Sequence, residues 1–395
     1  MIPEENKRVI AFKSGPLADS EKQSIVIVGP VSPPYGGPEK ITESLLGSPL
    51  FNSLFDIHHV NTQKPLSNEQ RSRFQFINVL YNVRDLANLI GAILRHRPRT
   101  VFVFLSQNKL AFARDAVFIA VGVVLGRRVV ASREGSYFQE FYSGCGTLGR
   151  WLIRRTLRLT THLRVESEMI RSQFDGLTDP ARVTVCRTGI DPGPLGNLPP
   201  REPTGCLRIL FMANISVAKG AVDLVRAIDV MRRHYSGQLQ LRLAGGYIHR
   251  EQNITGVRGA NNAETQIAEL IEKHGLADCV AFPGPVYGAK KIEEFAAADV
   301  FVLPSYSEGL SNALMEAVAA GLPVIAARVG ALPECVAHGE NGFLIEPGDS
   351  ESLGKHLAEL ANDPGLRLRM GKASRALCEK KFRLDDFVTC LAKLL

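Results

Sequence analysis

The sequence predicts an α/β fold with two similar Rossmann-like domains that face a cleft. Three observations predict it: the chain has 395 residues, its apolar runs alternate with helical stretches, and one Pro/Gly-rich segment interrupts that alternation near the middle. A chain of this length exceeds what one ordinary hydrophobic core organises. Alternating strands and helices are typical of parallel sheets that are covered on both faces.

The first half of the chain contains the elements of one such domain. Residues 24–29 form an apolar run that ends in Gly29, which is typical of a buried parallel strand, and a helix is expected from about Glu39. The longest apolar run, residues 116–126, is too short to cross a bilayer, which needs about 20 residues. We therefore expect a buried helix or a helix–strand junction there. Further strands are expected at residues 100–105 and 128–131.

Residues 189–205 are rich in Pro and Gly and mark the best domain boundary, because the α/β pattern restarts after them. In the second half, strands are expected at residues 207–212, 239–244, 280–282, 300–303 and 323–326, with helices centred near Val225, Leu270, Phe295 and Ala317. The closing region, residues 353–395, is expected to be largely helical. The predicted organisation is a flexible segment 1–22, an N-terminal domain 23–195, a C-terminal domain 196–375 and a C-terminal helix 376–395 that packs back on the N-terminal domain.

The composition, 45% apolar and 22% charged, is that of a globular protein in water. The seven cysteines are scattered with no CxxC pair, which is typical of reduced thiols in a cytosolic protein and not of a disulfide framework or a zinc site. The N-terminus has no apolar region behind a basic start, so a secretory signal is not expected.

The net charge of +7 is concentrated in the first half of the chain. Residues 1–191 contain 25 Lys/Arg against 17 Asp/Glu, a net of +8, and the remainder contains 22 against 23, a net of −1. The first half is therefore expected to meet an anionic partner, such as a membrane leaflet, a lipid phosphate or a nucleic acid.

Residues 304–325 form the most informative motif. Glu308 lies in a Gly/Ser loop after the predicted strand 300–303, and Glu316 lies in the apolar helix that follows. The amides of Gly309 to Ser311 at a helix N-terminus attract phosphate, and carboxylates accept hydrogen bonds from sugar hydroxyls. The combination predicts a nucleotide-sugar site. The alternatives are a solvated loop position for Glu308 and a backbone or arginine partner for Glu316.

Two other loops follow predicted strands. Lys219 lies on a glycine-containing turn after residues 207–212, where a cation can neutralise a phosphate leaving group. Gly36 and Gly37 follow the first strand and remove Cβ atoms where a ligand can press on the backbone, although the loop is not a GxGxxG fingerprint. The alternatives are a solvated lysine and a plain turn.

Residues 304–325, with residues 330–334 and 339–349, resemble the C-terminal half of the family-four retaining glycosyltransferases. Lys219-Gly220, the Gly36-Gly37 loop and residues 187–191 fit the same family. The resemblance spans about residues 24–385 and is stronger in the C-terminal domain. It implies the GT-B architecture of two Rossmann-like domains around a cleft.

The resemblance also implies roles for individual residues. Glu308 would hold the transferred sugar, Glu316 the ribose, and Lys219 would neutralise the diphosphate, with Glu308, Lys219 and Glu134 as the catalytic set. The implied donor-binding set is Glu316, Gly309, Leu310, Ser311, Asn312, Asn214, Gly36, Gly37 and Val286, the last because the base would lie near residues 285–287. Front-face displacement with retention is implied, in which the leaving phosphate helps to deprotonate the acceptor. The carboxylates then bind substrate and are not an acid/base pair. No metal or other cofactor is expected, and the chain has no Asp-x-Asp motif.

Three positions depart from the family pattern. Asn214 stands where a basic residue usually accompanies the lysine, Glu134 stands where a histidine is frequent, and Thr188-Gly189 replaces the usual Asn-Gly. We expect Glu134 to contact sugar hydroxyls, although a carboxylate cannot act as a neutral imidazole. These changes keep a second hypothesis open, a catalytically silent homologue that acts as a binding or scaffold subunit.

Arg150, Arg154 and Arg158 recur every four residues, with Arg155 and Trp151 beside them. On a helix they would form a stripe suited to an anionic leaflet that presents a lipid-linked acceptor. The alternative is a solvated face over an ordinary core stripe. Nucleic-acid binding is not expected, because no aromatic-rich basic motif is present.

The sequence therefore predicts a retaining, hexosyltransferase-type glycosyltransferase. It would move a sugar from a nucleoside-diphosphate-sugar to a polysaccharide or lipid-linked glycan, without a metal, in the cytoplasm and peripherally at the inner face of the membrane. Nucleotide-sugar epimerisation fits residues 304–325 less well.

Overall fold

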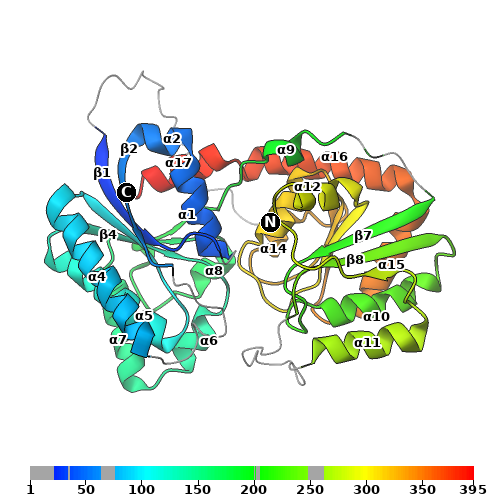
Figure 1. Cartoon of the computed structure of the whole chain (residues 1–395), viewed down its shortest axis with the longest axis horizontal. Helices are drawn as coiled ribbons and strands as arrows, with labels where there is room; N and C mark the ends of the chain where they lie inside the picture. The colour runs from blue at the N-terminus through cyan, green and yellow to red at the C-terminus, as the bar shows by residue number, and fades with distance from the viewer. Residues whose placement is uncertain (1–21, 34–35, 64–75, 200, 202–204, 248–261) are drawn as a thin grey trace, which may run out of the picture.

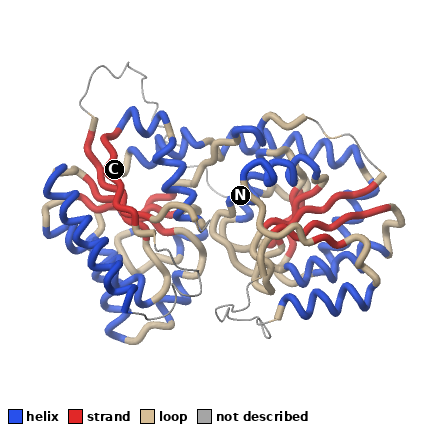
Figure 2. The backbone as a smooth tube through the Cα atoms, in the orientation of Figure 1, coloured by secondary structure: helices blue, strands red, loops and turns tan. Residues whose placement is uncertain are grey.

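The computed structural model describes residues 22–33, 36–63, 76–199, 201, 205–247 and 262–395. These residues form two domains side by side, each built on one six-stranded parallel sheet with helices on both faces (Figures 1 and 2). The predicted α/β fold of two Rossmann-like domains is confirmed. Residues 1–21, which belong to the segment expected to be flexible, lie outside the described residues.

The N-terminal sheet has the strand order β2-β1-β3-β4-β5-β6. Its strands are β1 (Gln23–Gly29), β2 (Phe55–Asn61), β3 (Thr100–Phe104), β4 (Arg128–Arg133), β5 (His162–Val165) and β6 (Val183–Val185). Its helices are α1 (Gly37–Gly47), α2 (Pro49–Leu54), α4 (Phe76–His96), α5 (Lys109–Val124), α6 (Phe138–Ser143), α7 (Thr147–Leu159), α8 (Glu168–Ser172) and the 3-10 turn η1 (Pro180–Arg182).

Alternation along β1 explains why helices cover both faces of this sheet. Ile25 and Ile27 pack in one cluster with α1, α2 and α17 (Leu384–Ala392), whereas Val26 and Val28 pack in another with α4, α5 and α7. Successive strand residues point to opposite faces, so a continuous apolar run requires two covering layers.

The C-terminal sheet has the order β12-β11-β10-β7-β8-β9, so the winding direction reverses between β7 and β10. Its strands are β7 (Cys206–Met212), β8 (Gln238–Ala244), β9 (Val280–Ala281), β10 (Val300–Leu303), β11 (Val324–Ala327) and β12 (Gly342–Ile345). The remaining helices are α9 (Gly193–Gly196) in the connection and α10 (Ala221–Arg232), α11 (Ala263–His274), α12 (Gly288–Ala297), α13 (Asn312–Ala319), α14 (Leu332–Cys335), α15 (Ser350–Asn362) and α16 (Pro364–Lys381).

The chain returns to the N-terminal domain at its end (Figure 1). The backbone of Ile190 accepts a hydrogen bond from Leu384 at 3.1 Å, and α17 then buries Phe387 and Leu391 against the cluster that contains Ile25. The predicted boundary between residues 375 and 376 does not fall at a structural break, because α16 continues to Lys381.

Four strands were not expected from the sequence: β2, β5, β6 and β12. The edge strand β2 contains polar residues, including His58 and His59, and β5 has four residues, of which one is Arg164. In β2 and β5, polar or charged side chains interrupt the apolar run by which the other strands are recognised.

Candidate functional site

The loops after β7 and β10 meet at the point where the strand order reverses. In open α/β sheets, ligands bind at the carboxyl ends of the strands at such a point. Gly220 has a φ of +71° and lies against the carbonyl of Pro304, where a Cβ atom would clash, so only glycine lets the two loops come this close. The sequence places Lys219 in the first loop and Glu308 in the second.

The structure brings Lys219 and Glu308 into direct contact. The Nζ atom of Lys219 lies 2.6 Å from Oε1 of Glu308, and the same oxygen accepts a hydrogen bond from Oγ of Ser305 at 3.0 Å. The two side chains remain 29% and 12% exposed. A cation and a carboxylate side by side can hold adjoining anionic and hydroxyl-bearing parts of one ligand.

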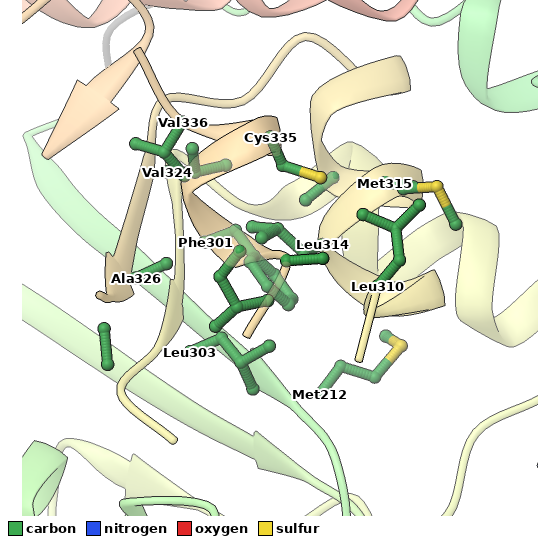
Figure 3. Packing of buried hydrophobic residues seen from close by; sticks show 14 of the residues in the cluster. Met212, Phe301, Leu303, Leu310, Leu314, Met315, Val324, Ala326, Cys335 and Val336 are labelled. Carbon is green, nitrogen blue, oxygen red and sulfur yellow. The ribbon is translucent and has the colours of Figure 1, made fainter. Parts of the chain in front are cut away.

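The apolar core fixes the loop that carries Glu308. Leu310 and, in α13, Leu314 and Met315 are buried beside Phe301 and Leu303 of β10 (Figure 3). Ser311 caps α13, and its side chain accepts a hydrogen bond from the amide of Leu314 at 3.4 Å. The backbone direction at residues 308–312 is therefore set by packing.

Glu316 lies inside α13, where it is 9% exposed. Its Oε1 atom accepts a hydrogen bond from Nζ of Lys291 at 2.6 Å. The partner is thus a lysine of α12 and not the backbone group or arginine considered from the sequence. Nothing in the sequence marks Lys291 as the partner of Glu316, because lysines are common on an amphipathic surface helix.

The other predicted donor-binding residues divide between the two domains. Asn214 follows β7 and is exposed, Ser311 and Asn312 are half-buried at the start of α13, and Val286 is half-buried against the core of the C-terminal domain. Gly36 and Gly37 lie at the start of α1 in the N-terminal domain. None of the described contacts joins these two glycines to Glu308 or Glu316.

Glu134 lies at the end of β4 in a buried charged cluster. Its Oε1 atom accepts hydrogen bonds from Oγ of Ser132 and from Nη1 of the fully buried Arg164, both at 2.6 Å. Its Oε2 atom is buried and has no hydrogen-bond partner within the described part of the chain. Burial raises the pKa of Glu134, and the charge of Arg164 opposes that rise. Burial also lowers the pKa of the neighbouring Arg133 to about 10.

Glu166 connects this cluster to the C-terminal domain. Its Oε1 atom accepts a hydrogen bond from Thr188 at 2.8 Å, and its Oε2 atom accepts one from the backbone amide of Leu310 at 3.1 Å. The Leu310 amide, expected from the sequence to face a diphosphate, therefore binds a carboxylate in this structure.

Further contacts join the two domains along the surface where they meet, which is called the seam below. The hydroxyls of Ser136 and Ser307 lie 2.6 Å apart, and Arg187 pairs with Glu334. A Cβ atom on Gly309 would lie 2.7 Å from the amide nitrogen of Gly135.

Sequence reasoning missed Arg164 and Glu166. The signal for them is the pair of charged residues on either side of Val165. They lie at the end of β5, which was not predicted, and β5 pairs with β4, which ends at Arg133. Side chains that follow neighbouring parallel strands gather at one sheet edge.

Within the described ranges, no three His, Cys, Asp or Glu side chains are grouped so as to hold a metal ion. No helix in the described part of the chain is long and apolar enough to span a bilayer. The seven cysteines are free, and five of them are buried.

Comparison with known proteins finds similarity in the C-terminal half of the chain. Residues 200–377 match the family described as "Glycosyl transferases group 1". A D-inositol 3-phosphate glycosyltransferase of Streptomyces avermitilis is 35% identical over 176 residues, which cover 44% of this chain and 36% of that protein. A glycogen synthase of Mycobacterium tuberculosis is 25% identical over 245 residues, which cover 62% of this chain and 55% of that protein. The chain thus spans between about a third and a half of the curated relatives that it matches.

Similar solved structures extend the likeness to both domains. Anabaena Alr3699/HepE, solved with UDP-glucose, has a TM-score of 0.66 at 17% identity and covers 94% of this chain and 98% of its own. The lipopolysaccharide outer core galactosyltransferase WaaB has a TM-score of 0.68 at 13% identity, with 94% and 99% covered. At sequence identities this low, the similarity shows that the folds are alike and nothing more.

Proposed function

We propose that this chain is a retaining, hexosyltransferase-type glycosyltransferase, because residues 200–377 match the glycosyl transferases group 1 family and the two domains have a GT-B fold. It moves a sugar from a nucleoside-diphosphate-sugar to a polysaccharide or lipid-linked glycan. The observation that supports this most directly is the Lys219–Glu308 pair, 2.6 Å apart at the reversal point of the C-terminal sheet.

In this proposal each charged group meets one part of the donor. Lys219 contacts the diphosphate and stabilises the negative charge that develops on the leaving group. Glu308 accepts hydrogen bonds from hydroxyls of the transferred sugar, and Glu316 accepts them from the ribose. Lys291, which now holds Glu316, either shares that carboxylate with the ribose or releases it.

The remaining features of the reaction follow from the same arrangement. Oε1 of Glu308 is held by Lys219 and Ser305, which suits a binding carboxylate better than a nucleophile, so we propose front-face displacement with retention. Lys219 supplies positive charge at the leaving group, so we propose transfer without a metal. Product NMR tests retention, and turnover in the presence of a chelator tests metal independence.

The proposal is tested by the release of nucleoside diphosphate from a panel of nucleotide-sugars that includes UDP-glucose. Glu308→Gln should lower turnover by about 10- to 100-fold, the value of hydrogen bonds to a charged group. Asp299→Asn is the control, because Asp299 is 5% exposed, pairs with Arg208 at 2.8 Å and precedes β10, at the opposite end of that strand from Glu308. Equal turnover of Glu308→Gln and the wild type would contradict the proposal.

The second candidate function is a silent homologue that binds without transferring. It is favoured by the exposed Asn214 and by Glu134, whose Oε1 is already engaged by Arg164. Tight binding of a nucleotide-sugar without turnover on any acceptor would select it.

We also propose a cytoplasmic enzyme that contacts an anionic membrane through its N-terminal domain. Helices α4, α5 and α7 lie next to each other on one face of that domain (Figure 1). Their sequences contain two carboxylates, Asp85 and Asp115, and both are buried and paired with the preceding arginine. The surface therefore offers arginines and exposed apolar side chains without free negative charge, which suits an anionic leaflet.

A further inference from the structure

The loop amide expected to bind a donor phosphate already holds an anionic oxygen from the other domain. Oε2 of Glu166 accepts the hydrogen bond of the Leu310 amide at 3.1 Å. The side chain of Leu310 is buried in the core of the C-terminal domain, so the direction of its N–H is fixed. A carboxylate oxygen and a phosphate oxygen are the same kind of acceptor for such an amide.

Glu166 is held firmly in this position. It is 3% exposed, its Oε1 atom accepts the hydroxyl of Thr188 at 2.8 Å, and Nη2 of Arg164 lies 4.0 Å away. A buried carboxylate with these partners is held in one position, because each of its two oxygens accepts a hydrogen bond.

The contact between Glu166 and the loop leaves no gap for another group. A Cβ atom added to Gly309 would lie 2.8 Å from Oε2 of Glu166 and 2.7 Å from the amide nitrogen of Gly135. A phosphate and this carboxylate therefore cannot share the Leu310 amide, both for lack of space and because both are negative.

We propose that Glu166 is a positioning residue that closes the donor site in the absence of donor. Its carboxylate binds the Leu310 amide across the domain seam, and a nucleoside diphosphate has to displace it. Donor binding then breaks this contact between the domains, because the phosphate and the Glu166 carboxylate cannot both bind the Leu310 amide. The identity of the displacing ligand rests on the proposed function, whereas the contact itself does not.

The first test needs no nucleotide. Hydrogen exchange by mass spectrometry on peptides covering residues 304–315 compares the wild type, Glu166→Ala and Glu168→Ala. Glu168 is a matched control, since it is two residues away, 66% exposed, and pairs with Arg171 on its own helix. Glu166→Ala should speed exchange in this loop by about tenfold, and Glu168→Ala should not. Unchanged exchange in Glu166→Ala would overturn the proposal.

The second test is calorimetry with UDP, GDP and the parent nucleosides. Glu166→Ala should bind the accepted diphosphate about tenfold more tightly, with unchanged affinity for the nucleoside. Glu166→Gln should lie between, because it keeps an oxygen for Leu310 but loses the charge, and it also serves if the alanine variant unfolds.

Weaker diphosphate binding by both variants would overturn the proposal, since Glu166 would then assist the donor. If the wild type and the variants bind none of the nucleotides, the proposed function fails, and the exchange measurement still decides whether Glu166 holds the loop.

Discussion

Glu308 and Glu316, eight positions apart in the chain, each accept a hydrogen bond from a lysine at 2.6 Å. In both pairs the lysine is more exposed than the carboxylate. Partly exposed pairs of this kind contribute little to stability, about 0 to 1 kcal/mol. They orient the carboxylates at little cost, and a ligand can replace the lysine on either of them.

The two lysines should differ in their effect on the reaction. Lys219→Met should lower kcat by about 10²- to 10³-fold, because a charge at the leaving group acts mainly in the transition state. Lys291→Met should act chiefly on KM, because Glu316 is expected to contact the ribose, which does not react. Steady-state kinetics on the accepted donor separates the two, and equal effects on kcat would contradict these roles.

Arg164 should be the costliest single charge to remove. It is fully buried, and Arg164→Met leaves Glu134 without its guanidinium partner, which should cost about 3 to 5 kcal/mol of unfolding free energy. Arg171→Met, in the exposed pair with Glu168, should cost less than about 1 kcal/mol. Chemical denaturation measures both.

The pH dependence of the Arg164→Met loss has a definite sign. Burial raises the pKa of Glu134 above its unfolded value, so ionisation of Glu134 weakens the fold, and protonation removes that cost. The loss should therefore shrink as the pH falls through the folded pKa and grow as the pH rises. A loss that is constant with pH would contradict the assignment.

At the scale of elements, α7 is amphipathic with arginines on its exposed side. Ile153 and Leu157 are buried, Arg154 and Arg155 are exposed, and Trp151 is 61% exposed. An indole left in water beside guanidinium groups is typical of a helix that lies in a membrane interface.

The double variant Arg154→Gln/Arg155→Gln should reduce binding to vesicles containing phosphatidylglycerol by about 30-fold, from about 1 kcal/mol for each arginine lost. Arg233→Glu is the control, because Arg233 is 61% exposed at the C-cap of α10 in the other domain. Sedimentation with vesicles at two salt concentrations measures the effect. Equal loss in both variants would mean that the net charge, and not this helix, governs binding.

At the scale of the whole molecule, the last helix of the chain completes the first domain. Phe387 of α17 is 2% exposed, its ring lies 5.0 Å from the guanidinium carbon of Arg164, and it packs in the cluster that contains Ile25. The N-terminal core therefore depends on residues at the far end of the sequence.

Phe387→Ala should lower the stability of the N-terminal domain by about 3 to 5 kcal/mol, the usual cost of truncating a buried aromatic ring. Leu368→Ala, at a 41% exposed position of α16, is the control and should have little effect. Denaturation followed by limited proteolysis identifies which domain opens first. If Phe387→Ala destabilised only the C-terminal domain, this would contradict the dependence of the N-terminal core on α17.

Much of the fold could be predicted because its strands are apolar runs. Residues 24–29 and 300–303 are buried on both faces, so their sequences are continuous and recognisable. The strand β5 could not be predicted, since four residues with one buried arginine resemble a loop. The candidate site followed the same pattern, because Lys219 and Glu308 lie in the loops after the predicted strands β7 and β10, whereas Glu166 follows the unpredicted strand β5.

The sequence by itself determined the two Rossmann-like domains, the resemblance of the second one to a known family, and the residue types at the ends of its strands. Local periodicity and turn residues can be recognised within a short stretch of sequence, without knowledge of which distant residues come into contact. Only the tertiary structure decided which charges meet: Lys219 with Glu308, Lys291 with Glu316, and Glu166 with the Leu310 amide. These pairs join residues 25 to 144 positions apart, and their formation depends on sheet order and domain closure, which no local pattern specifies.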